Sequence, residues 1–164
     1  MEKFSLDPEI AELIRAPKAV EGDRLRFQAP KPGGKLSVRL ITPSNSAWKF
    51  YLDISEGSRV SSVAINLREP NRKITMQTRY YASPLVRIDL TDTGIHTNPD
   101  GTRIVGSHVH FATKRYADRI AFPLAEQDII PDLARCTSIP DTFEALRAFC
   151  SIDRNIYIEW LQGA

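Results

Sequence analysis

The amino-acid sequence predicts an α+β fold, in which a mostly antiparallel, twisted sheet is covered on one face by helices. Apolar residues recur at every second position through the centre of the chain, and helical spacing occurs near its two ends. Pro, Gly, Asn and Ser separate the alternating stretches, which is typical of short strands joined by tight turns and paired antiparallel. A sheet curled into a partial barrel is the alternative architecture.

The bulk composition is that of an ordinary globular protein. The 164 residues, 42% hydrophobic and 26% charged, predict a single domain over 1–164. No apolar run approaches a membrane span, and the N-terminus carries acids where a secretory signal needs bases. We therefore expect a cytoplasmic protein without a membrane segment. The net charge of +2 does not itself indicate nucleic-acid binding, but bases outnumber acids in residues 15–39 and 103–119.

The first predicted element is a helix over residues 7–16. Asp7 is a suitable N-cap, and Pro8 is favourable at the first helical position. Apolar residues then recur with helical spacing, so one face of this helix should pack on the sheet.

The predicted sheet extends over about residues 24–124. Its alternating stretches are residues 24–29, 36–40, 48–54, 63–67, 73–81, 85–90 and 107–112. A further strand at 120–124 is interrupted by Pro123. Alternation puts apolar side chains on one face and polar ones on the other. The polar face is predicted to carry Arg39, Lys49, Arg68, Gln77, Arg79, Arg87, Asp89, His108 and His110.

The last predicted elements are a helical part over 128–152 and a strand or tail over 155–164. Residues 128–136 resemble a short helix interrupted by Pro131, whereas Ser138 begins a capping-box-like sequence before a better helix. Apolar residues spaced by two in the final segment favour an edge strand or a docking tail.

All three histidines of the chain lie within one short window, residues 95–114. Residues 98–101, Asn-Pro-Asp-Gly, predict a turn ahead of an alternating stretch. In that stretch His108 and His110 share one face of a strand, opposite Val109 and Phe111. Two imidazoles placed in this way are compatible with a metal clamp, an acid/base pair or two polar residues on a solvated face.

The first functional hypothesis is a metal-independent ribonuclease. Cleavage through the 2′-hydroxyl needs a base, an acid and a cation, and histidine suits both proton transfers because its pKa lies near neutral pH. His108 and His110 are the candidate pair, with His96 as a substitute for either. The candidate phosphate-binding residues are Arg79, Arg87, Lys114 and Arg115, and the candidate base-stacking residues are Tyr81 and Tyr116. The alternative is a solvated sheet face with ordinary arginines and histidines.

The second hypothesis is a metal site. His-x-His on a strand is a genuine ligand spacing, and His96 or Asp89 is available as a third ligand. A cupin would have an acid a few residues beyond its second histidine, where this chain has Lys114 and Arg115. Cations beside a divalent metal are unfavourable, so the metal hypothesis ranks below the phosphate one, and we expect no metal or other cofactor.

The third hypothesis is a protein that binds without catalysis. A basic sheet face on a small protein is suited to RNA, DNA or an acidic protein surface. We expect RNA as the first candidate partner and leave the oligomeric state open.

The segment LVRIDLTDTGIHTNPDGTRIVGSHVHFATKRYADRIAFPL resembles an uncharacterised family of small bacterial and prophage-encoded proteins. The motifs that carry the resemblance are an H-x-N-P-D-G loop (96–101), a G-x-H-x-H strand (106–110), an aromatic and acidic stretch (116–118) and an aromatic-Pro-Leu exit (122–124). The resemblance covers roughly residues 48–152. The chain departs from the family after His110, where Phe-Ala-Thr-Lys-Arg stands in place of a Tyr followed by a Glu-Gly turn.

The resemblance implies context and not chemistry. A prophage-type origin suits a toxin, a defence component or a counter-defence inhibitor. The sequence therefore predicts a protein whose polar sheet face binds a phosphate-rich partner, with cleavage by the histidines as the active version. The alternatives are a phage-encoded inhibitor of a bacterial nucleic-acid-handling complex and a His-ligated metal-binding protein.

Overall fold

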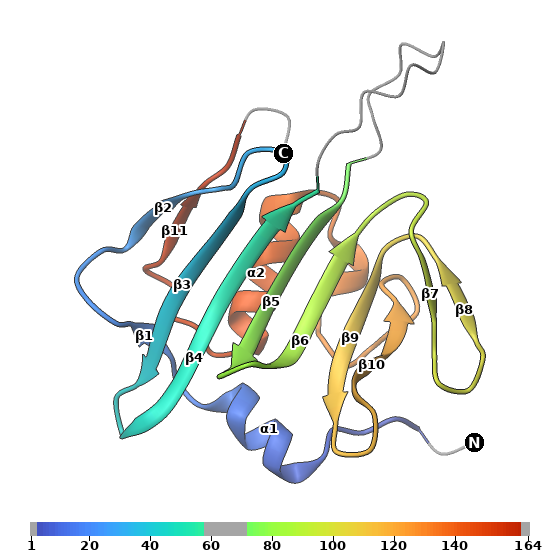
Figure 1. Cartoon of the computed structure of the whole chain (residues 1–164), viewed down its shortest axis with the longest axis horizontal. Coiled ribbons are helices and arrows are strands. Elements are labelled where there is room, and N and C mark those ends of the chain that lie inside the picture. Colours follow the sequence, from blue (N-terminus) through green and yellow to red (C-terminus); the bar gives the residue numbers. More distant parts are fainter. Residues whose placement is uncertain (1–2, 58–71, 162–164) are drawn as a thin grey trace.

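A computed structural model describes residues 3–57 and 72–161 of the chain (Figure 1). Within these residues the main sheet has seven strands in the order β1-β3-β4-β5-β6-β9-β10, and every pairing is antiparallel. The strands are β1 (Ala19–Val20), β3 (Lys35–Thr42), β4 (Asn45–Glu56), β5 (Ile74–Tyr80), β6 (Ser83–Leu90), β9 (His108–Thr113) and β10 (Ala117–Pro123). The α+β prediction is confirmed. The sheet is not closed into a barrel, because its outermost strands β1 and β10 are not paired with each other.

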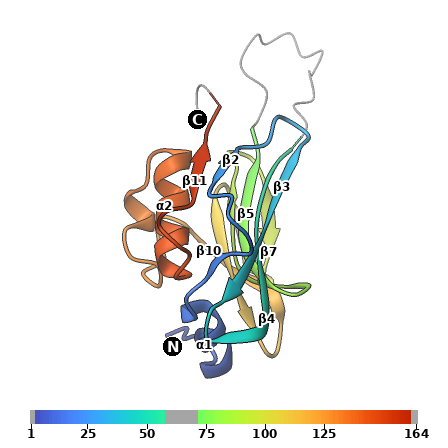
Figure 2. The ribbon, with the colours of Figure 1, turned by 90° about the vertical axis from the view of Figure 1, so that its left-hand side faces the viewer.

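Helices cover one face of this sheet. Figure 2 shows α2 (Ile139–Phe149) on one side of the strands, with α1 (Pro8–Arg15) at their lower end. The core forms between the helices and the inward side chains of the strands. Its completely buried members include Leu40, Phe50, Leu52, Met76, Ile88, Val109, Phe111 and Leu146. Alternation along the strands therefore places the apolar face as predicted.

Local capping sets the bounds of α2. The Ser138 hydroxyl accepts a hydrogen bond from the Asp141 N–H at 3.2 Å, as the capping sequence predicts. The helix predicted at residues 128–136 is wrong in extent, because only a 3₁₀ turn, η1 (Leu133–Arg135), forms there. The Gln127 side chain bonds both the N–H and the carbonyl of Ile130, so this segment is a loop held by a side chain.

Two predicted strands pair away from the main sheet. β2 (Arg26–Gln28) and β11 (Tyr157–Glu159) form a parallel two-stranded sheet, which joins the last strand of the chain to a segment far from it in sequence. Phe27 and Ile158 are buried on its inner side, so this small sheet covers part of the core. The strand predicted at residues 63–67 and Arg68 lie outside the described residues.

A further hairpin, β7 (Ile95–Thr97) and β8 (Arg103–Val105), stands beside β10 at one end of the sheet (Figure 1). The sequence predicts only its turn, and that turn is present: the Gly101 N–H donates to the Asn98 carbonyl at 2.9 Å, and Gly101 has φ +89°. Within the described residues, no helix is long and apolar enough to cross a membrane.

Candidate metal centre

The three histidines meet at one point of the fold. β9 supplies His108 and His110, and β7 supplies His96. The ring centroids lie 4.9 Å apart for His108 and His110, 4.6 Å for His96 and His110, and 5.5 Å for His96 and His108. One ring nitrogen from each residue lies within 4.8 Å of the others. The window of histidines in the sequence is therefore a cluster in space.

The cluster is not an open surface. His108 is 5% exposed and His110 1% exposed, whereas His96 is half-buried. The prediction of a solvated polar face is wrong for these two residues, because the β7–β8 hairpin places the ring of His96 against both of them. The alternation along β9 does not reveal that the hairpin covers these rings, because the hairpin is not paired with the main sheet by backbone hydrogen bonds between strands.

Asn98 holds the hairpin in place. Its side-chain oxygen accepts from the Ala121 N–H at 2.9 Å, and its side-chain nitrogen donates to the Ala121 carbonyl at 3.0 Å. Ala121 belongs to β10, the outermost strand of the sheet at this end, so the Asn98 amide takes the position of a further strand. Gly106, with φ +93°, then turns the chain from β8 into β9.

Backbone carbonyls fix which nitrogen of each ring carries a proton. A carbonyl oxygen only accepts, so a ring nitrogen that contacts it must donate. In a neutral ring the other nitrogen then presents a lone pair. Metal-binding histidines characteristically donate their second nitrogen in this way. The contacts are His96 Nε2 to the Arg119 carbonyl (2.8 Å), His108 Nδ1 to the Gly106 carbonyl (2.7 Å) and His110 Nδ1 to the Asp118 carbonyl (2.9 Å).

A buried carboxylate faces the remaining nitrogens of His108 and His110. The Asp89 Oδ2 atom, on the adjacent strand β6, lies 3.3 Å from His108 Nε2 and 3.2 Å from His110 Nε2. When the rings are neutral, these contacts place acceptor against acceptor, which a shared cation relieves. Two ligands of one tetrahedral ion with bonds of about 2.0–2.1 Å are roughly 3.3 Å apart. The spacing of Asp89 Oδ2 from these two nitrogens therefore suits a common metal. The three ring nitrogens, which lie within 4.8 Å of one another, would draw closer around such an ion.

The protonation states suit a metal as well. Burial lowers the pKa of His110, which favours the neutral ring that a metal requires. Burial alone would raise the pKa of Asp89. Proton donation to Asp89 by His108, His110 and Thr75, together with the charge of Arg87, outweighs that effect and holds its pKa far below the usual range. The contributions of His108 and His110 require positive charge at their Nε2 atoms, which a proton supplies in the metal-free protein and a bound ion would supply in its place. Asp89 is therefore ionised.

Arg87 reaches the same point from β6. Its Nη2 lies 2.9 Å from His110 Nε2, its Nη1 3.0 Å from an Asp118 oxygen, and its Nε 3.3 Å from Asp89 Oδ2. Arginine only donates, so its contact with Nε2 independently identifies that nitrogen as an acceptor. The contacts of His110 with Asp118 and with Arg87 thus indicate the same tautomer.

The other predicted site residues are placed elsewhere. Arg79 binds Asp53 on β4 at 2.6 Å and the carbonyl of Tyr81, and the Arg115 guanidinium lies 4.9 Å from the ring centre of Tyr116. Among the described contacts, none joins these residues to a histidine. Arg87 is the only predicted phosphate-binding residue that the described contacts bring to the cluster.

Lys114 also turns away from the histidines. Its ammonium group binds Glu9 of α1, and its backbone N–H donates to Asp7 at 2.8 Å. Lys114 therefore gives no reason to reject a metal at the histidines.

Sequence reasoning underrates Asp89 and misses Asn98 and Asp118. The alternation that places Asp89 and the histidines on one sheet face was the signal for Asp89. Asn98 is interpreted only as a turn residue, because its bond to β10 depends on tertiary packing. Three imidazole nitrogens and one carboxylate oxygen are a donor set that suits Zn²⁺, Fe²⁺, Mn²⁺, Co²⁺ or Ni²⁺.

Comparison with known proteins identifies a family and no established activity. No curated protein and no solved structure matches the chain. The model of a family of unknown function, DUF6978, matches residues 6–153. The chain therefore belongs to this uncharacterised family, DUF6978.

Proposed function

We propose that this protein binds one divalent first-row transition metal ion through His96, His108, His110 and Asp89. One observation carries the proposal: each imidazole donates one N–H to a backbone carbonyl, and the rings meet beside a buried, ionised carboxylate. When bound, such an ion polarises an oxygen ligand or lowers the pKa of a bound water.

Burial favours this proposal over the metal-independent ribonuclease. A histidine pair that takes a proton from a 2′-hydroxyl has to contact the substrate. His108 and His110 are 5% and 1% exposed, and the rings of His96 and of each other occupy the space beside them. An ion reaches such nitrogens far more easily than an RNA strand does.

The direct test is metal binding by purified, chelator-treated protein. Calorimetric titration with Zn²⁺ and Co²⁺ should give one site per chain. Each of the variants His96→Ala, His108→Ala, His110→Ala and Asp89→Asn should weaken binding by about 10- to 100-fold or more. Asp53→Asn is the matched control, because Asp53 is an equally buried carboxylate on the same sheet face, held by Ser37, Gln77 and Arg79 and by no histidine.

The chain offers a clean background for this test, because it has no other histidine. Absence of binding for Zn²⁺, Co²⁺, Mn²⁺, Fe²⁺ and Ni²⁺ contradicts the proposal. Equal loss of binding in Asp53→Asn and Asp89→Asn also contradicts it, because a general loss of structure would then be the cause.

Nucleic-acid binding is a second candidate function, supported by three exposed arginines. Arg103, Arg115 and Arg119 are exposed on β8, on the β9–β10 turn and on β10. Substitution of all three by Glu should abolish binding of a fluorescent RNA oligonucleotide and leave the fold of the protein unchanged. RNA cleavage to cyclic phosphate ends by metal-free protein would restore the ribonuclease hypothesis. A prophage-type role as an inhibitor remains compatible with binding alone.

A further inference from the structure

Arg87 and a bound metal ion would compete for one lone pair. The Nη2 atom of Arg87 lies 2.9 Å from His110 Nε2, which is the nitrogen that faces Asp89. An ion bound to that nitrogen displaces the hydrogen bond. The side chain of Arg87 is 28% exposed and its Nη1 binds Asp118, which is 27% exposed. The guanidinium therefore has space to turn outward while it stays anchored beside the ion.

The displaced guanidinium presents two neighbouring donors. Its Nε makes no hydrogen bond in the structure, although Asp89 Oδ2 is 3.3 Å away, and its Nη2 loses its partner to the metal. Nε–H and Nη2–H lie on one edge of the planar group and point in parallel. This edge is the fork that grips two oxygens of a phosphate or carboxylate.

The charge of the site changes sign when a metal binds. Asp89 and Asp118 against Arg87 leave the metal-free cluster with one negative charge, which attracts a cation. A divalent ion turns this into one positive charge, which attracts an anion as a further ligand of an ion that accepts five or six. Exposed Arg119, whose carbonyl accepts from His96, adds positive charge beside the same rings.

We propose that the metal-loaded site binds a phosphoryl oxyanion, held between the ion and the Nε/Nη2 edge of Arg87. This inference rests on the proposed metal binding and assigns Arg87 as the residue that determines the class of ligand. Phosphate is favoured over a carboxylate because it brings more negative charge and more oxygens to a site with a metal, Arg87 and a neighbouring arginine.

The test uses the full chain loaded with Co²⁺, whose visible absorption reports its ligands. Inorganic phosphate should change the spectrum of the wild-type protein in a saturable way. In Arg87→Gln the phosphate affinity should fall roughly tenfold or more, since hydrogen bonds to a charged group are lost. Arg87→Lys should give an intermediate loss, because lysine keeps the charge without the fork. Affinity for Co²⁺ itself should rise in Arg87→Gln, because the guanidinium that competes for His110 Nε2 is removed.

Arg79→Gln is the matched control, because Arg79 is also a partly exposed arginine that pairs with a buried aspartate on the same face. It should leave phosphate binding within about twofold of wild type. Competition identifies the source of the ligand: a short RNA that displaces phosphate points to a phosphodiester, and its failure to do so points to a small phosphate compound.

The outcomes separate the two proposals. If Co²⁺ does not bind the wild-type protein, the metal proposal itself fails. If Co²⁺ binds but phosphate leaves the spectrum unchanged, only the present inference fails. Equal phosphate affinity in wild type and Arg87→Gln also overturns it, as does displacement of phosphate by equimolar acetate.

Discussion

Each imidazole of the cluster uses one nitrogen for the backbone, and the nitrogen differs between residues. His108 and His110 donate from Nδ1, whereas His96 donates from Nε2. The free nitrogen is thus Nε2 in the two strand residues and Nδ1 in the hairpin residue. A ring without such a carbonyl would be able to rotate or change tautomer, so these contacts prepare the cluster for an ion before it arrives.

Removal of a strand histidine should destabilise the fold more than removal of the hairpin histidine. His110→Ala leaves a cavity and an Asp118 carbonyl without its donor, because the ring is 1% exposed. We expect it to lower the free energy of unfolding by about 2–4 kcal/mol. His96→Ala should cost about 1 kcal/mol, since its ring is half-buried on a hairpin. Both should lose metal binding.

Urea denaturation of the metal-free variants measures the free energy of unfolding, and metal titration measures the loss of binding. Equal destabilisation by the two substitutions would contradict the unequal burial of the rings.

Lys18, which lies away from the histidine cluster, should make the stability of the fold depend on pH. It is 2% exposed, and its ammonium donates to the carbonyls of Ile14 and Ala16 at 2.8 Å and of Cys150 at 2.7 Å. Burial lowers the pKa of Lys18 from 10.5 to about 8. Between these values the unfolded chain binds more protons than the folded one, so stability rises with pH. Below about pH 8 the full cost of burying the charge is present.

We expect the loss of the Lys18 proton to raise the free energy of unfolding by an amount that approaches about 3 kcal/mol by pH 10. The measurement is the free energy of unfolding from pH 7 to 10 for wild type and for Lys18→Met, because the difference cancels the titration of other groups. Parallel curves for the two proteins would refute the assignment to Lys18.

At the scale of elements, the β7–β8 hairpin converts a polar sheet face into a buried site. Its inner face carries His96 and the buried Ile104, and its outer face carries Ile95 and Val105, which are 56% and 67% exposed. Its position depends on Asn98, which binds both backbone groups of Ala121. The hairpin is therefore the element whose docking decides whether His96 reaches the cluster.

Asn98→Ala should loosen this docking. The substitution leaves the Ala121 N–H and carbonyl on a sheet edge without partners, which costs about 1–3 kcal/mol. Metal affinity should fall together with stability, since His96 is carried by the same hairpin. Thr97→Ala on the exposed side of β7 is the control and should change neither. Hydrogen exchange of the Ala121 amide reads out the docking directly, and unchanged protection in Asn98→Ala would exclude the mechanism.

The elements differ in how far the sequence determines them. β3 to β6 and α2 are predicted because alternation, turns and the Ser138 cap are local signals. The sequence does not reveal that β2 pairs with β11 far along the chain, because alternation gives no partner. For the same reason the sequence places His108 and His110 on one strand face but does not reveal that a hairpin covers them. The cluster was predictable, whereas its burial and its carbonyl contacts were not.

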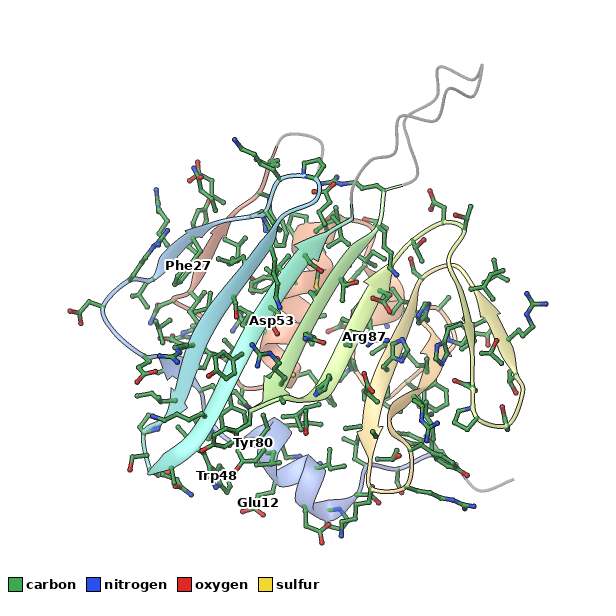
Figure 3. All side chains as sticks on the ribbon, viewed as in Figure 1. Glu12, Phe27, Trp48, Asp53, Tyr80 and Arg87 are labelled. Carbon is green, nitrogen blue, oxygen red and sulfur yellow. The ribbon has the colours of Figure 1, made fainter. Side chains whose placement is uncertain are left out.

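At the scale of the whole molecule, the outer sheet face is organised around two buried carboxylates. Asp53 is 3% exposed and Asp89 5% exposed. Figure 3 shows Asp53 and Arg87 on the sheet face opposite α2, and Asp89 shares the face of Arg87 because it lies two residues further along β6. Asp53 is fully satisfied by Arg79, Gln77 and Ser37, and it serves as a structural network. Asp89 has Thr75 and Arg87 but also two imidazoles whose free nitrogens face it. Only the second arrangement leaves a position for an ion.

Metal binding should therefore stabilise the entire fold, because the ligands come from β6, β7 and β9. An ion that binds only the folded state at 100 times its dissociation constant adds about 2.7 kcal/mol to the free energy of unfolding. For a chain of this size that corresponds to a rise in Tm of roughly 5–10 °C. Differential scanning calorimetry of chelator-treated protein with and without Zn²⁺ measures the shift, with Asp89→Asn losing it and Asp53→Asn keeping it. A Tm that stays constant at saturating Zn²⁺, or that rises equally in Asp89→Asn, would show that the cluster is a structural network like that of Asp53.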